Sequence, residues 1–246
     1  HYRDRRQRQM CIRDSLRVKP GEKSKSFNVK NSLDEKLLEK KFNRNSLIIG
    51  FGGGVVGDLS GYVAATILRG IDLVHIPTSL IAIVDSSIGG KTGINSKNGK
   101  NLIGSFYNPR EILINSEFIK TLSLKEIRQG LSEIIKYGVI KNEKIFNFLE
   151  KSNKVFMQNH KKNIDKIIKE CIKIKIDTVE KDFKENDLRS ILNFGHTIGH
   201  ALEKKYSYKF SHGDCIGTGM AIESLIANNI YKLSTKNFSR ILKLLD

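Results

Sequence analysis

The stretch SLIIGFGGGVVGD, residues 46–58, decides the fold expected of this chain. Its first six residues form a short apolar run, typical of a strand buried in a parallel sheet. Gly52, Gly54 and Gly57 then satisfy the pattern G-x-G-x-x-G, and the apolar segment 59–68 that follows is predicted to be helical. In this context the motif is typical of dinucleotide binding, because the glycines let the backbone approach a pyrophosphate at the N-terminus of the helix. The stretch therefore predicts a Rossmann-like α/β unit.

The nucleotide motif departs from the usual pattern in one respect. A second strand is expected at residues 73–77, but no acidic residue follows it to bind the ribose hydroxyls. Two interpretations stay open. Either the adenosine end of a dinucleotide is recognised elsewhere, or the glycines only make a tight turn without a ligand.

A second glycine-rich segment, VDSSIGGKTGIN at residues 84–95, surrounds Lys91 with small and hydroxyl-bearing residues. A lysine ammonium and exposed backbone amides suit phosphate or carboxylate groups. Lys100 lies in a further polar turn, residues 98–104. The spacing does not match the loop of P-loop NTPases, so this segment disfavours that class.

Histidines gather near the end of the chain, in the segment LNFGHTIGH at residues 192–200 and just after it. His196 and His200 are four residues apart and fall on one face of a predicted helix. His212 follows in a glycine-containing turn, which could bring its side chain back to the helix face that carries His196 and His200. Neutral imidazoles grouped in this way suit a transition metal, and the alternative is three ordinary core or surface histidines.

From about residue 116 the apolar pattern becomes helical, which predicts an all-α part after the α/β part. The candidate helices are residues 126–140, 144–156, 162–179, 188–204 and 218–231. In the first of them Glu133 and Lys136 share one face, either as an ordinary surface ion pair or as a metal ligand and a substrate anchor. The predicted units are an α/β unit at 16–115 and a helical unit at 116–246, with a ligand cleft at their junction.

Composition narrows the function classes. The net charge of +17 invites nucleic-acid binding, but the lysines spread along amphipathic helices and the chain has no tryptophan and no recognisable reader motif. No apolar run suggests a membrane span, no secretory leader is recognised, and three scattered cysteines favour a cytoplasmic location. Residues 1–15 hold five of the twelve arginines and no lysine, so this segment is expected to be non-native or disordered.

Six motifs together resemble the 3-dehydroquinate synthase family over about residues 16–246. They are GGGVVGD at 52–58, PTSLIAIVDSSIGGKTGIN at 77–95, KNLIGSFYNP at 100–109, GLSEIIKYG at 130–138, LNFGHTIGHALE at 192–203 and HGDCIGTGMAIE at 212–223. Family members are longer at both ends. The chain is therefore expected to be a fragment, inactive or poorly stable by itself, of a protein that forms a homodimer at full length.

The resemblance implies a zinc or cobalt ion bound by Glu133, His196 and His212, with His200 facing the substrate and not the metal. It also implies a tightly held NAD, whose contacts would be Glu22, Lys25, Gly53, Gly54, Val55, Asp58, Thr78, Ser79, Lys91, Lys100 and Thr121. The implied substrate-contacting or catalytic residues are Asp85, Lys91, Lys100, Asn101, Lys136, Arg189, Asn193 and His200.

The activity implied by the resemblance converts an anionic sugar acid phosphate, 3-deoxy-D-arabino-heptulosonate 7-phosphate, into 3-dehydroquinate and phosphate, a step of the shikimate pathway. NAD-mediated oxidation, β-elimination of phosphate, reduction and an intramolecular aldol closure would follow one another. One alternative is a related sugar phosphate cyclase such as 2-deoxy-scyllo-inosose synthase. The other is a metal-dependent polyol dehydrogenase, which the paired Lys91 and Lys100 disfavour because that enzyme needs no phosphate site.

Overall fold

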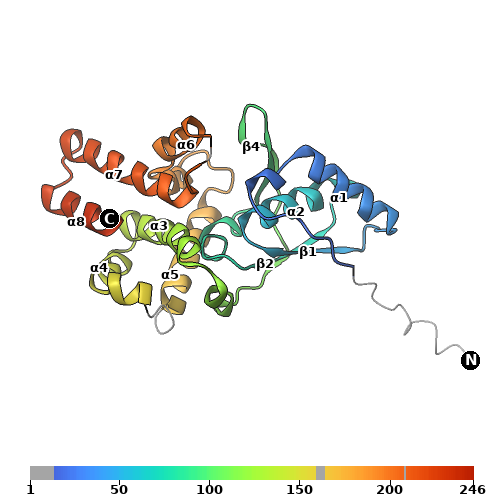
Figure 1. Cartoon of the computed structure of the whole chain (residues 1–246), viewed down its shortest axis with the longest axis horizontal. Helices are drawn as coiled ribbons and strands as arrows, with labels where there is room; N and C mark the ends of the chain where they lie inside the picture. Colours follow the sequence, from blue (N-terminus) through green and yellow to red (C-terminus); the bar gives the residue numbers. More distant parts are fainter. Residues whose placement is uncertain (1–13, 159–163, 208) are drawn as a thin grey trace, which may run out of the picture.

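The computed structural model describes residues 14–158, 164–207 and 209–246, with the backbone alone between 152 and 158. The predictions for residues 1–13 lie outside this range. The described chain forms an α/β part and a helical part that meet along the middle of the molecule (Figure 1). This confirms the predicted fold class.

A three-stranded parallel sheet organises the α/β part, in the order β1 (Leu47–Gly52), β2 (Asp72–Pro77), β5 (Glu111–Ile112). Helix α2 (Gly54–Thr66) connects β1 to β2, and the two strands pair from Leu47↔Asp72 to Gly52↔Pro77. Both predicted strands are therefore confirmed. The predicted helix 59–68 is wrong at both ends, because the glycine turn itself forms the first turn of α2 and Leu68 adopts a φ of 50°.

Helix α1 (Phe27–Glu39) packs against α2, although the sequence analysis identifies no helix there. Leu37 of α1 joins Val63 and Ala64 of α2 and Leu73 of β2 in a small core. Ser26 begins α1 as its N-cap, since its hydroxyl accepts from the backbone amide of Val29. Helix α1 thus covers α2 on one side of the α/β part.

An antiparallel hairpin of β3 (Lys91–Ser96) and β4 (Gly99–Phe106) projects from the α/β part (Figure 1). Residues 98–104 are predicted to form a polar turn, and that prediction is wrong because residues 99–104 belong to β4. Most of β4 is exposed. It therefore lacks the alternation of apolar and polar residues from which a half-buried strand is recognised. The hairpin carries Lys91 and Lys100 at the edge of the helical part.

The helical part contains α3 (Leu124–Ile140), α4 (Glu143–Gln158), α5 (Ile164–Lys181), α6 (His196–Lys205), α7 (His212–Ile230) and α8 (Thr235–Leu245). Short 3-10 turns cover Glu22–Ser24, Ile67–Arg69, Ser116–Thr121 and Leu188–Asn193, and a π-turn covers Ala82–Ser86. The main core includes Ile83 and Val84 of the π-turn beside Ile134 and Tyr137 of α3. The segment after β2 is thus built into the helical part.

Two of the predicted helices differ from the structure. The single helix expected at 188–204 is broken, because Gly195 adopts a φ of 81° between the 3-10 turn and α6. The helix expected at 218–231 begins earlier, so His212 is the first residue of α7 and does not lie in a turn before it. Helix α8 is absent from the sequence-based expectations.

Candidate active site

A cavity of about 1140 Å³ opens where the glycine turn, the β3–β4 hairpin and the helical part meet. This volume slightly exceeds the range of about 300–1,000 Å³ that is typical of small-molecule pockets. Most of the predicted site residues line the cavity, namely Glu22, Lys25, Gly53, Gly54, Val55, Asp58, Ser79, Asp85, Lys91, Lys100, Asn101, Lys136, Arg189, Asn193, His196, His200 and His212. Residues more than a hundred positions apart in the sequence therefore share one cavity.

Three predicted site residues lie outside the cavity lining, namely Thr78, Thr121 and the predicted metal ligand Glu133. Thr78 directly follows β2, and its backbone amide donates to the carbonyl of Gly52 over 2.9 Å. Thr121 ends a 3-10 turn, is exposed, and its hydroxyl donates to the carbonyl of Phe118. Thr78 is still next to the glycine turn, whereas the Thr121 hydroxyl bonds within its own 3-10 turn.

At the nucleotide end of the cavity, Gly53 is the N-cap of α2, so the first amides of that helix have no partners within the helix. Carboxylates stand beside this turn, although none follows β2. Lys25, only 3% exposed, donates to Asp58 over 2.5 Å and lies 3.5 Å from Glu22. Asn101 of the hairpin also accepts from Lys25. Burial raises the pKa of Asp58, and the Lys25 ammonium opposes that rise.

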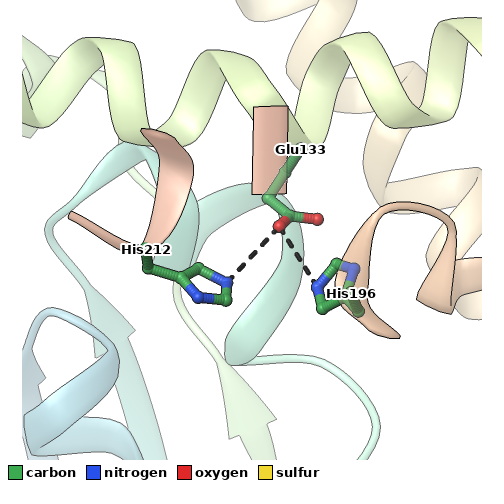
Figure 2. Close-up of side chains that lie close together, drawn as sticks. All are labelled: Glu133, His196 and His212. Carbon is green, nitrogen blue, oxygen red and sulfur yellow. Dashed lines mark ion pairs between the residues drawn. The ribbon is translucent and has the colours of Figure 1, made fainter. Parts of the chain in front are cut away.

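Glu133, His196 and His212 form one group of possible metal ligands (Figure 2). The two histidines line the helical side of the cavity, and Glu133 lies buried beside them. Glu133 comes from the middle of α3 and is 1% exposed, while the two histidines are the first residues of α6 and α7. Oε1 of Glu133 lies 3.5 Å from Nε2 of His196 and 3.7 Å from Nε2 of His212. Three different helices thus bring three donor atoms to one point.

Local sequence explains why both histidines begin helices. Gly195 takes the left-handed φ that turns the chain into α6, and its amide donates to Glu223 of α7 over 2.7 Å. Ser211 caps α7 by accepting from the amide of Asp214. Gly213 lets α7 approach α3, because a Cβ at this position would lie 2.5 Å from Cα of Gln129. His212 is thereby placed over α3 and Glu133.

The donor set fits a divalent metal ion. Zinc binds imidazole nitrogen and carboxylate oxygen at about 2.0–2.2 Å, which puts tetrahedral ligand atoms about 3.3 Å apart. The 3.5 and 3.7 Å separations at Glu133 are close to that spacing. Two histidines and one carboxylate also leave positions open for a substrate, as a catalytic metal requires.

Protonation within this group is set by its neighbours. Burial opposes ionisation of Glu133, but the Lys136 ammonium outweighs it and holds the pKa of Glu133 at about 2. Burial lowers the pKa of His196 to about 4, so its imidazole is neutral at neutral pH. Burial also works against the charged form of His212, yet its hydrogen bonds with Glu133 and Glu203 raise its pKa to about 9. Metal binding would therefore displace a proton from His212.

His200 lies one turn after His196 but does not share the Glu133 group. Its side chain is 59% exposed, and its Nε2 is 4.0 Å from Glu203. Its ring centroid is 5.4 Å from that of His196 and 6.0 Å from that of His212. His200 thus lies as close to His196 as His212 does and lines the cavity, but it is not part of the donor group around Glu133.

Buried cations occupy the remaining wall, around Asp85. Lys175 donates to Asp85 over 2.7 Å and Tyr137 over 2.6 Å, while Lys136 lies 3.9 Å away. Burial opposes ionisation of Asp85, but the two lysines hold its pKa well below the usual range. Arg189, 1% exposed, donates to the carbonyls of Gly89 and Phe183. Such a group of fixed cations suits an anionic ligand.

Three members of the site escape the sequence analysis. Lys175 is one of the lysines that spread along the predicted amphipathic helices, yet it continues the buried positions Ile168 and Cys171 along α5, and this register was the available signal. Glu185 pairs with Lys91 and accepts from Asn193 over 2.6 Å. Glu203 accepts from Lys100 over 2.8 Å. No local pattern identifies either glutamate, because their partners come from distant segments.

Comparison with known proteins identifies the same family over both parts of the chain. The model of the 3-dehydroquinate synthase N-terminal region matches residues 15–129, and that of the C-terminal region matches residues 130–246. The 3-dehydroquinate synthase of Dictyoglomus thermophilum is 47% identical over 230 residues, covering 93% of this chain and 64% of that protein. The one from Clostridium perfringens is 51% identical over 214 residues, covering 86% of this chain and 60% of that protein. The chain thus spans less than two thirds of the length of these relatives.

Solved structures give a matching result for the fold. A 2-epi-5-epi-valiolone synthase from Streptomyces hygroscopicus with NAD+ and Zn2+ bound aligns with a TM-score of 0.87 at 25% identity, covering 93% of this chain and 65% of that one. A 2-deoxy-scyllo-inosose synthase complexed with carbaglucose-6-phosphate, NAD+ and Co2+ aligns with a TM-score of 0.84 at 29% identity, covering 94% and 64%. An iron-containing alcohol dehydrogenase shares only the fold, at 13% identity and a TM-score of 0.59. Since both regions match one family and the relatives in that family are far more similar in sequence than these cyclases, the chain belongs to the 3-dehydroquinate synthase family.

Proposed function

We propose that this chain carries the active site of a 3-dehydroquinate synthase, which converts 3-deoxy-D-arabino-heptulosonate 7-phosphate into 3-dehydroquinate and inorganic phosphate. The observation that supports this most directly is the arrangement of one cavity. His196 and His212 of the donor group, the glycine turn at the start of α2 and a set of buried cations all line it, and Glu133 lies directly beside the two histidines. A substrate with both a carboxylate and a phosphate matches these cations.

We propose that Glu133, His196 and His212 hold zinc or cobalt, and that the glycine turn, with Glu22, Lys25 and Asp58 nearby, holds NAD. When bound, the metal would polarise a substrate hydroxyl and NAD would accept and return its hydride. The cyclase structures described above, which contain NAD+ with Zn2+ or Co2+, support this assignment.

The chain's own residues would orient and stabilise the substrate. Lys136, Lys175 and Arg189 are buried and fixed before any ligand arrives, so they stabilise anionic groups without reorganising. Asp85 holds Lys175 and Tyr137 in place and keeps its own charge. Lys91 and Lys100 of the hairpin, with Asn101, Asn193 and His200, would bind the phosphate end.

We further propose the two units 16–115 and 116–246, a homodimer at full length, a cytoplasmic location and no nucleic-acid partner. Cys171 and Cys215 are both free and buried, which supports a reducing environment. Among the described residues, no helix is both long and apolar enough to cross a bilayer.

Phosphate release from the seven-carbon substrate tests the proposed function. The assay would use the 246-residue chain alone and the same chain extended with the segments of the Clostridium perfringens relative that it does not match. In the extended protein we expect phosphate release that requires NAD, stops with a chelator and returns with Zn2+ or Co2+. The His196→Ala variant should lose it, whereas Glu150→Gln, at an exposed ion pair with Arg240, should retain it.

Three results would contradict the proposal. Phosphate release that needs neither NAD nor a metal ion would show that neither cofactor takes part in the reaction. Stoichiometric accumulation of NADH would indicate a polyol dehydrogenase, because a synthase returns the hydride within each turnover. Turnover of glucose 6-phosphate in place of the sugar acid phosphate would favour the 2-deoxy-scyllo-inosose synthase alternative.

A further inference from the structure

Glu203 is a buried carboxylate at the edge of the metal group, and the proposed function gives it no role. It lies on α6, two turns after His196, and its side chain is 2% exposed. Its Oε1 accepts from Nζ of Lys100 over 2.8 Å and lies 3.3 Å from Nδ1 of His212. A buried carboxylate is costly unless it is paired, and here one oxygen faces two partners.

The two nitrogens of His212 face two different carboxylates. Nε2 lies 3.7 Å from Oε1 of Glu133, inside the metal group, while Nδ1 faces Glu203 on the outer side. When Nδ1 of a histidine donates to a carboxylate, the ring orientation and tautomer are fixed and the other nitrogen is available as a metal ligand. His212 is 28% exposed, so burial alone does not fix its ring.

Glu203 is itself held from across the cavity. Lys100 lies on β4, in the hairpin that projects beside the helical part (Figure 1), and it is separated from Glu203 by 103 residues. The Lys100 ammonium and the helix α6 backbone therefore fix the carboxylate from two sides. The position of the Glu203 Oε1 atom beside His212 therefore depends on the hairpin lying against the helical part.

We propose that Glu203 is a positioning residue for the metal centre, which orients His212 through Nδ1 so that Nε2 points at the ion. The inference rests on the proposed function in one respect, that Glu133, His196 and His212 bind a metal. A purely structural role for Glu203 would predict lower stability of the fold with no specific change in metal affinity or ligand geometry.

Cobalt(II) binding by the chain tests the proposal without any turnover. Affinity would be measured by competition with a chromophoric chelator, and ligand geometry by the visible absorption of the bound ion. We expect Glu203→Ala to bind Co2+ about 10- to 100-fold more weakly than the wild type, with an altered absorption spectrum. Glu203→Gln keeps a neutral acceptor for Nδ1 and should recover part of that loss.

Controls separate this inference from the proposed function. Glu150→Gln should bind Co2+ as the wild type does, and urea unfolding with EDTA present identifies any variant that fails to fold. If Glu203→Ala and Glu203→Gln both bind within twofold of the wild type with the same spectrum, the positioning role is wrong although the metal site stands. If the wild type binds no Co2+, or His196→Ala binds as tightly as the wild type, the metal site itself is refuted and the inference falls with it.

Discussion

Protonation of His75 should destabilise this protein as the pH falls below neutrality. His75 lies on β2 directly opposite Gly50 of β1, and only 5% of it is exposed. A Cβ at Gly50 would lie 2.9 Å from Nδ1 of His75, so the glycine leaves the space that the ring fills. Among the described residues nothing forms a hydrogen bond with this nitrogen. Burial therefore lowers the pKa of His75 from 6.5 to about 4.

The direction and size of the effect follow from this pKa. The unfolded chain, with a His75 pKa near 6.5, takes up the proton at a higher pH than the folded chain does. The stability that neutral His75 contributes is thus complete above about pH 7 and is lost as the pH falls toward 4. The loss amounts to about 2 kcal/mol at pH 5 and approaches about 3 kcal/mol at still lower pH.

Urea unfolding between pH 8 and pH 5, with EDTA present, measures this loss. Other groups titrate over the same range, so the informative quantity is the difference in unfolding free energy between the wild type and a variant without this imidazole. His75→Gln and His75→Leu provide a polar and an apolar replacement. For both, we expect the wild-type advantage to shrink by about 2 kcal/mol from pH 8 to pH 5. A difference that stays constant with pH would refute the reasoning.

Further predictions concern the turn before α6, the Asp85 cluster and the hairpin lysine. Gly195→Ala should lower the unfolding free energy by about 1–3 kcal/mol and weaken Co2+ binding, because φ is 81° and a Cβ would lie 2.8 Å from the carbonyl of Ile216. Gly217→Ala, at a helical position where a Cβ would make only ordinary van der Waals contacts at 3.9 Å or more, should raise the unfolding free energy by about 0.5–1 kcal/mol in the same urea assay. Tyr137→Phe should cost about 1–3 kcal/mol by urea unfolding, since it removes a donor to buried Asp85; an unchanged value would contradict the hydrogen bond. Partial desolvation, with Arg189 and Lys175 nearby, lowers the pKa of Lys91 to about 8. Sulfate affinity measured by calorimetry should therefore fall between pH 7 and pH 9, whereas the Lys91→Arg variant, whose guanidinium stays charged, should keep its affinity at pH 9.

Much of the α/β part is predictable from sequence because its signals are local. The run at residues 46–51, the glycines after it and the strand at 73–77 each report on a few neighbouring residues, and the structure confirms both strands. Boundaries are less well predicted where a glycine changes the backbone direction. At Gly195 the helical pattern continues across a residue with a φ of 81°, so periodicity alone joins two elements that the structure separates.

The candidate site also combines features that local sequence predicts with features that only the tertiary structure shows. His196 and His212 are close in sequence, which suggests a shared site, but the local pattern also includes His200 and gives Glu133 no place with them. Only the packing of α3 against α7 brings Glu133 within 3.5 and 3.7 Å of the two imidazoles.

The sequence by itself therefore determined the strand–glycine turn–helix unit, the helical second part and the family to which the chain belongs. Tertiary structure alone decided which charged side chains are buried together. Lys175, Glu185 and Glu203 are unremarkable within their own helices and loops, and each acquires its partner from a segment far away in the chain. The physical reason is that burial makes a charge costly unless an opposite charge lies beside it, and the chain fold, not local spacing, supplies that neighbour.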